Sequence, residues 1–328
     1  MRKYRAIVAA VLATAPIVGV TAQPAQAVQP ATAKTWSSLM FTALNGSPEI
    51  VKLRAMLPAL RHAVVTRKVA IGQATTAQSA AQVAVTTATS TNLKARHAYA
   101  MATAARKAAK TPAERRRQKA ALQQRSTELD RSVVALRTAQ TGLRNATARL
   151  AAANDAWHAA TVAVRNAEQK VAAGGGFNPA VAAQAAKLAA QLVTDTRPGF
   201  TTGDTTQVYG ITVNKTIAYT FQRMIDDAAK AGVPMSGGGF RTRDQQIKLR
   251  VTNGCPDIWT APASSCRVPT AIPGRSLHEI GLAIDVTYGG RTIPNHDSVA
   301  YKWLAANAGR YGFVNLPSEP WHWSITGS

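Results

Sequence analysis

Two histidines, an aspartate and a glutamate near the C-terminus could together perform metal-assisted hydrolysis. His278 and Asp285 lie seven residues apart in one short stretch, and Glu319 and His322 lie three residues apart in another. A catalytic zinc ion takes three protein ligands and keeps one coordination position for water, and a nearby carboxylate can then serve as base. The residue types and spacings of the two stretches suit such a site, and the rest of the chain must position it.

The first stretch has the pattern of a half-buried strand. Residues 281–287 alternate between large apolar side chains and small or acidic ones, which is the period-two pattern of a strand with one buried face. On this strand Asp285 shares its face with Gly281 and Ala283, so room remains beside the carboxylate for an ion and a substrate backbone. His278 is expected in the turn that enters the strand.

The second stretch repeats this logic. Trp321 and Trp323 can face the core while His322 faces the opposite way. Two neighbouring prolines predict an irregular segment around Glu319. From that position the glutamate can approach a metal-bound water without being a ligand.

Three motifs together resemble the VanY-like D-alanyl-D-alanine carboxypeptidases, a group of zinc DD-peptidases that act on bacterial cell-wall peptides. They are Ser-x-His-x-x-Gly-x-Ala-x-Asp from Ser276, Glu-Pro-Trp-His-Trp from Glu319, and Ser-Gly-Gly-Gly-Phe-Arg-Thr from Ser236. The resemblance covers residues 204–328. It implies an α+β zinc DD-peptidase domain, with a small antiparallel sheet and flanking helices.

The resemblance also implies roles for single residues. It implies His278, Asp285 and His322 as zinc ligands and Glu319 as general base and acid. Arg241 would contact the substrate carbonyl or the developing oxyanion.

Other positions of the motifs are expected near the substrate. Ser276 and Gln246 are expected to bind substrate, and for Ser276 a hydrogen bond to a ligand loop is the alternative. Phe240 stands where the family often has tyrosine, so one hydroxyl group is missing.

The implied reaction is removal of the D-alanine that ends a peptidoglycan stem peptide. A zinc-bound water, its pKa lowered from about 15.7 towards about 7, would attack the peptide carbonyl, and Glu319 would pass its proton to the leaving amine. A D,D-endopeptidase that cuts peptidoglycan cross-links is one alternative. A non-catalytic wall-binding or spacer protein is the other.

The N-terminus predicts export. Residues 1–27 combine a basic start, an apolar run and an Ala-Gln-Ala ending, which is the pattern of a secretory signal peptide cleaved after Ala27. Residues 28–47 would form an N-terminal segment. We therefore expect a secreted protein associated with the cell wall, and an uncleaved membrane anchor is the alternative.

Positive charge is concentrated in the middle of the chain. The net charge is +23, and residues 31–176 carry 22 Lys/Arg against 6 Asp/Glu. Nucleic acid is not expected as a partner, because the chain is predicted to be exported and its basic part lacks interleaved aromatic residues. Anionic wall polymers or a membrane surface fit such a charge, and a merely solvated helix face fits it equally.

Residues 48–173 predict a basic, alanine-rich coiled coil. Large apolar residues recur every seventh position from Leu122 to Val171, five of them followed three residues later by alanine, which is a coiled-coil seam. Thr111, Pro112 and Glu114 form a strong helix start, and the rod would be about 90 Å long. An antiparallel hairpin with the preceding segment is expected. A parallel dimer or another coiled-coil partner is the competing arrangement.

Residues 174–203 then predict a linker with a short helix. In the segment that follows, we expect a strand at 208–213 and helices at 214–231, after Thr242 and at 298–311.

Only two cysteines are present, Cys255 and Cys266. In an exported chain they are expected to form a disulfide, which would contribute about 3 kcal/mol for a loop of this size. Two free thiols or a second metal site are the alternatives.

Overall fold

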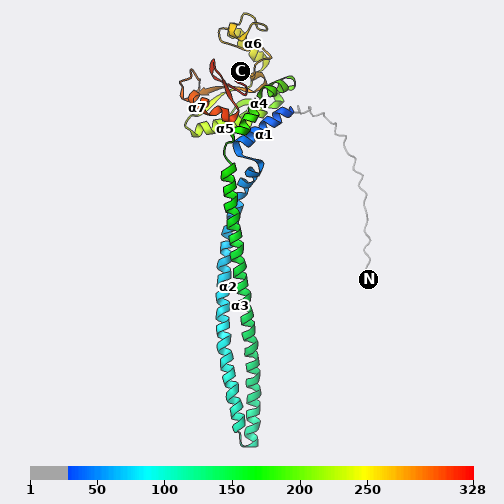
Figure 1. Cartoon of the computed structure of the whole chain (residues 1–328), viewed down its shortest axis with the longest axis vertical. Helices are drawn as coiled ribbons and strands as arrows, with labels where there is room; N and C mark the ends of the chain where they lie inside the picture. Colours follow the sequence, from blue (N-terminus) through cyan, green and yellow to red (C-terminus); the bar gives the residue numbers. More distant parts are fainter. Residues whose placement is uncertain (1–28) are drawn as a thin grey trace, which may run out of the picture. The chain divides into compact units, whose positions relative to one another are not determined.

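The computed structural model describes residues 29–328 (Figure 1). The predicted signal peptide and its cleavage site lie outside these residues. The chain divides into two compact units: Phe41–Val181 form one, and the described residues up to Met40 together with Ala182–Ser328 form the other. Within residues 29–328, no helix is both long enough and apolar enough to cross a membrane.

The first unit is an antiparallel helix pair, as the sequence predicted. Helix α2 spans Pro48–Ala108, α3 spans Pro112–Gly174, and the two lie side by side in Figure 1. The predicted capping box opens α3: the Thr111 side chain accepts from the Glu114 N–H, and the Glu114 carboxylate accepts from the Thr111 N–H. Pro58 lies inside α2, which continues through it.

The seam of this pair explains why the heptads of α2 are hard to recognise in the sequence. Polar side chains occupy two of its seam positions and bond across to α3. Asn92 Nδ2 donates to Ser132 Oγ over 2.9 Å, and Gln78 Nε2 donates to Thr147 Oγ1 over 3.1 Å. Asn92 and Ser132 are both buried. A buried, satisfied polar pair favours one register of a coiled coil over its alternatives.

The second unit contains more helix than expected. Helix α1 (Ala31–Asn45) starts in it, and α4 (Pro179–Thr196) ends in it. The predicted linker is therefore largely an 18-residue helix whose Leu192 is fully buried. Trp36 of α1 is also buried against Gly312, where an added Cβ would come within 2.7 Å of the indole.

A small antiparallel sheet forms the centre of this unit. Its strand order is β3-β4-β7-β6, and a short β5 pairs with the far end of β4. The strands are β3 (Met235–Gly238), β4 (Ala283–Tyr288), β5 (Arg291–Thr292), β6 (Val314–Leu316) and β7 (Glu319–Ser324). The mixed α+β architecture agrees with the expected fold class.

The prediction of a single strand at 208–213 is wrong, because this region forms a separate hairpin. Instead of one strand at 208–213, β1 (Thr205–Val208) and β2 (Ile211–Asn214) pair around a two-residue turn. Tyr209 and Gly210 have φ values of 51° and 79°. A two-residue hairpin turn of type I′ needs positive φ at both central positions and usually has Asn, Asp or Gly at the first. Tyrosine is unusual there, so the sequence did not predict this turn.

The three predicted helices of this unit are present as α5 (Lys215–Lys230), α6 (Arg243–Thr252) and α7 (Val299–Asn307). Thr242 and Gln245 form the expected capping box at the start of α6. Asn214 caps α5 by accepting from the Thr216 N–H.

Candidate metal centre and active site

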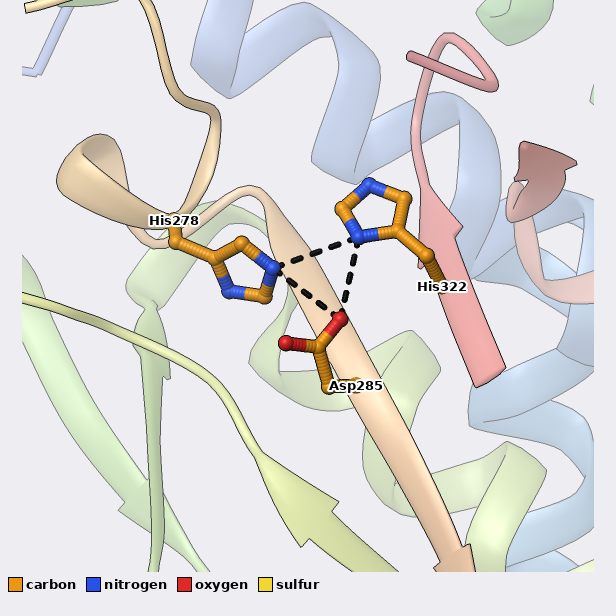
Figure 2. A group of neighbouring side chains, drawn as sticks. All are labelled: His278, Asp285 and His322. Atoms are coloured by element: carbon orange, nitrogen blue, oxygen red, sulfur yellow. Dashed lines mark hydrogen bonds and ion pairs between the residues drawn. The ribbon is translucent and has the colours of Figure 1, made fainter. Parts of the chain in front are cut away.

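Three side chains converge at one end of β4. Figure 2 shows the rings of His278 and His322 pointing at the carboxylate of Asp285. His278 Nε2 and His322 Nδ1 lie 3.2 and 3.0 Å from Asp285 Oδ1, and 3.3 Å from each other. These three residues are the group among residues 29–328 that could hold a metal ion.

Strand pairing brings two of these residues together. Asp285 on β4 and His322 on β7 are direct partners in the antiparallel ladder. His278 comes from a short 3-10 turn, His278–Ile280, that ends at Gly281 with φ of 68°. A side chain at Gly281 would come within 2.7 Å of the Asn214 main-chain nitrogen. The turn can therefore deliver His278 only because glycine follows it.

Each imidazole is oriented by a main-chain oxygen behind it. His278 Nδ1 lies 2.7 Å from the Gly239 oxygen, and His322 Nε2 lies 3.2 Å from the Ser328 oxygen. A ring N–H that donates to such an oxygen leaves the other nitrogen with a free lone pair. The lone pairs of His278 Nε2 and His322 Nδ1 then face the centre, as metal-binding histidines require.

The electrostatics favour a cation at this point. Burial alone would raise the pKa of Asp285, but hydrogen bonds from the two rings and their charge outweigh it and hold that pKa well below its usual range. Burial lowers the pKa of His322, yet the bond and attraction to Asp285 raise it overall. The Asp285 carboxylate thus stabilises positive charge at this point, and a metal ion bound to the two ring nitrogens would take the place of the ring protons.

Arg241 is tied to the centre from the other side. Its guanidinium donates to Asp285 Oδ2 over 3.1 Å and to Gln246 Oε1 over 2.8 Å. Gln246 is buried, and its amide nitrogen donates to the Ala271 oxygen. The structure therefore places Gln246 behind Arg241 as an orienting group, and the substrate contact expected for it stays a prediction.

Glu319 starts β7, three residues before His322. It lies outside the close group of metal-binding atoms. Burial raises the pKa of Glu319, and the charges of His322, Asp285, His278 and Arg241 all act on its carboxylate. A half-buried carboxylate with a raised pKa beside a metal centre can accept and return a proton.

Ser276 holds the turn that carries His278. Its buried hydroxyl accepts from the His278 N–H over 3.3 Å. Glu279 accepts from the main-chain N–H groups of Gly274 and Ser276. In this contact the Ser276 hydroxyl accepts, whereas the sequence suggested that it would donate to substrate or to a ligand loop, and that donor role stays a prediction.

Arg197 is a site-supporting residue that the sequence did not reveal. It follows α4, and its guanidinium donates to the main-chain oxygens of Gly274, Arg275 and Ser276. Burial lowers the pKa of Arg197, and the charge of Glu279 opposes this effect. No local pattern connects positions that are some 80 residues apart, so only the folded chain shows this contact.

The loop after α6 is fixed by the predicted disulfide between Cys255 and Cys266. Arg250, fully buried, donates to the main-chain oxygens of Asp257, Ala261 and Thr270. A cavity of about 490 Å³ lies beside α6, and Asp285 and Arg241 are among the residues that line it.

Residues 210–328 match the model of the family VanY, described as D-alanyl-D-alanine carboxypeptidase. A D-alanyl-D-alanine carboxypeptidase of Enterococcus faecalis is 29% identical over 123 residues, which are 32% of this chain and 45% of the relative. Another from Enterococcus faecium is 30% identical over 125 residues, which are 34% of this chain and 37% of the relative. The chain therefore spans less than half the length of each.

One solved structure is also similar. It is a vancomycin-resistance D,D-pentapeptidase VanY mutant in complex with Zn(II), with 24% identity. The match covers 38% of this chain and 78% of that chain, with a TM-score of 0.29.

Proposed function

Because residues 210–328 form a VanY-like domain, we propose that the chain is a zinc D,D-carboxypeptidase that removes the terminal D-alanine of peptidoglycan stem peptides. The observation that carries the proposal is the convergence of His278, Asp285 and His322, with Glu319 and Arg241 beside them. The D-alanyl-D-alanine carboxypeptidase relatives support the substrate class.

The donor set fits zinc. Two imidazoles and one carboxylate form a usual catalytic zinc set, and ligand atoms around a tetrahedral zinc lie about 3.4 Å apart. The three donor atoms here are separated by 3.0 to 3.3 Å. Each histidine also has a main-chain oxygen behind its ring, which can fix the tautomer that binds a metal. A zinc ion bound there would supply Lewis acidity and lower the pKa of a bound water.

The chain's own residues then divide the remaining work. The Glu319 carboxylate takes the proton of the attacking water and returns it to the leaving amine nitrogen, which its raised pKa favours. The Arg241 guanidinium, held by Gln246, places positive charge where the carbonyl oxygen becomes negative. Ser276 and Arg197 keep the His278 turn in place.

The test is D-alanine release. The zinc-loaded chain is incubated with a pentapeptide ending in D-Ala-D-Ala, and free D-alanine is measured by mass spectrometry. Glu319→Gln should abolish release, while Glu49→Gln, a change to an exposed carboxylate on the helix pair, should not. Release that persists in Glu319→Gln would contradict the role of Glu319.

A cross-linked substrate separates the carboxypeptidase from the endopeptidase. Peptidoglycan dimers should stay intact while pentapeptide is trimmed. Cutting of dimers without trimming would favour the D,D-endopeptidase, and zinc-dependent binding without any cleavage would favour a wall-binding protein.

For the helix pair we propose a polyanionic partner in the cell wall, which is the location that the predicted signal peptide favours. The bend between α2 and α3 carries seven exposed basic residues within 104–119 against one acid. That acid, Glu114, is already used in the capping box. Replacing Arg115, Arg116 and Arg117 by glutamine should weaken salt-sensitive binding to a phosphodiester wall polymer. Unchanged binding, or binding to anionic vesicles alone, would contradict this partner.

A further inference from the structure

Helix α6 has two faces with different tasks. Gln246 and Arg250 are buried, and they hold Arg241 and the disulfide loop. The residues at the spacing i, i+3, i+4 and i+7 of one helical face instead line the cavity beside Asp285. They are Gln245, Lys248, Leu249 and Thr252.

Lys248 is the unmatched charge of this cavity. Of the described residues that line the cavity, Asp285 is the acidic one, and it is already bonded to Arg241 and both histidines. Among the ion pairs within residues 29–328, none includes Lys248. An exposed ammonium group on the wall of a substrate-sized cavity can recruit an anion.

The rest of the wall suits a peptide chain. Gly238 and Gly239 expose main chain on the side of β3, and Phe240 and Leu249 supply apolar surface. A peptide that lies along this wall with its scissile carbonyl at Arg241 would pass the face of α6 that carries Lys248.

We infer that Lys248 is a carboxylate-binding residue of the substrate site. This inference rests on the proposed function, since a D-Ala-D-Ala peptide always carries a free C-terminal carboxylate one residue beyond the scissile bond. A carboxylate elsewhere on the stem peptide has the same chemistry and is the second source. In either case Lys248 selects an anionic peptide over a neutral one.

The experiment measures binding, so that it does not depend on turnover. The zinc-loaded full chain with Glu319→Gln is titrated by calorimetry with three ligands. They are a neutral acetylated peptide ending in D-Ala-D-Ala, the same peptide as its C-terminal amide, and the complete stem pentapeptide. Lys248→Met in this background should weaken binding of the first ligand about fivefold, the loss of one partly exposed charge pair, and leave the amide unchanged.

The other variants separate charge from shape. Lys248→Arg should retain the affinity, and Lys187→Met, which removes an exposed charge on α4, should have no effect. If Lys248→Met weakens binding of the pentapeptide but not of the acetylated peptide, Lys248 binds a carboxylate within the stem and not the C-terminal one. Equal affinities of Lys248→Met and its parent for all three ligands, or no binding of any ligand, would overturn the inference.

Hydrolysis and carboxylate binding can fail separately. If binding depends on Lys248 but the unsubstituted chain releases no D-alanine, the proposed carboxypeptidase function is contradicted and the proposed carboxylate-binding role of Lys248 is supported. If D-alanine is released but binding does not depend on Lys248, the carboxypeptidase function is supported and the role of Lys248 is contradicted.

Discussion

Asp285 and His322 are direct partners across β4 and β7, and their side chains meet with Oδ1 and Nδ1 3.0 Å apart. The same Asp285 oxygen faces His278, while its other oxygen accepts from Arg241. One carboxylate therefore joins the proposed metal ligands to the proposed oxyanion group, and its replacement should affect both.

Asp285→Asn should weaken zinc binding and abolish hydrolysis. Changing a residue behind a metal ligand typically costs 10–100-fold in affinity, so loss of a charged ligand should cost at least about 100-fold. Competition with a chromogenic chelator measures the affinity. Asp297→Asn, a change to an exposed loop carboxylate, is the matched control. Unchanged zinc affinity in Asp285→Asn would remove this residue from the metal centre.

Arg241→Lys should lower kcat while leaving zinc binding nearly intact. Lysine keeps the charge but cannot hold Asp285 and Gln246 at once with a planar fork. Loss of one preoriented oxyanion donor costs about 100-fold or more in kcat. Arg243→Lys is the control, because Arg243 lies over the Trp259 ring. Equal losses in both variants would argue against a specific role for Arg241.

Arg197→Met should loosen the turn that carries His278. Three main-chain oxygens lose their donor, and a buried group left unsatisfied costs about 1–3 kcal/mol. The expected result is weaker zinc binding and a lower denaturation midpoint. Arg275→Met, an exposed side chain in the same loop, should change neither. A stability loss without weaker zinc binding would limit Arg197 to a structural role.

Tyr311→Phe should lower stability in a pH-dependent way. Tyr311 donates to Asp227 over 2.8 Å. Burial and this bond raise the pKa of Tyr311 to about 12. Burial raises the pKa of Asp227, but the bonds from Tyr311 and Lys230 and nearby positive charge lower it overall.

The direction of each pKa shift sets the pH range in which the pair stabilises the fold. The raised tyrosine pKa gives stability that is present below pH of about 10 and is lost as pH rises towards 12. The lowered aspartate pKa gives stability that is present above pH of about 4 and is lost in more acid solution. At pH values from 5 to 9, urea unfolding should therefore show that Tyr311→Phe is less stable than the unsubstituted chain by about 1–2 kcal/mol. A difference that does not shrink outside this window would contradict the pairing.

The sequence alone was sufficient for the parts that depend on local spacing. The heptads from Leu122, the capping box at Thr111 and the alternation around Asp285 each lie within a few turns or one strand, so periodicity reveals them. The motif residues could be grouped around one ion because their types suit zinc chemistry and because the motifs resemble the VanY-like family. The predicted export signal and the role of each site residue remain predictions.

The tertiary structure decided what depends on distant segments. It showed that Asp285 and His322 face each other, because strand register is set by pairing and not by either strand alone. It turned the predicted linker into a helix whose following residue, Arg197, supports the His278 turn. It also separated the two faces of α6, placing Gln246 behind Arg241 and Lys248 in the cavity. Such contacts join positions with no shared local pattern, so only packing determines them.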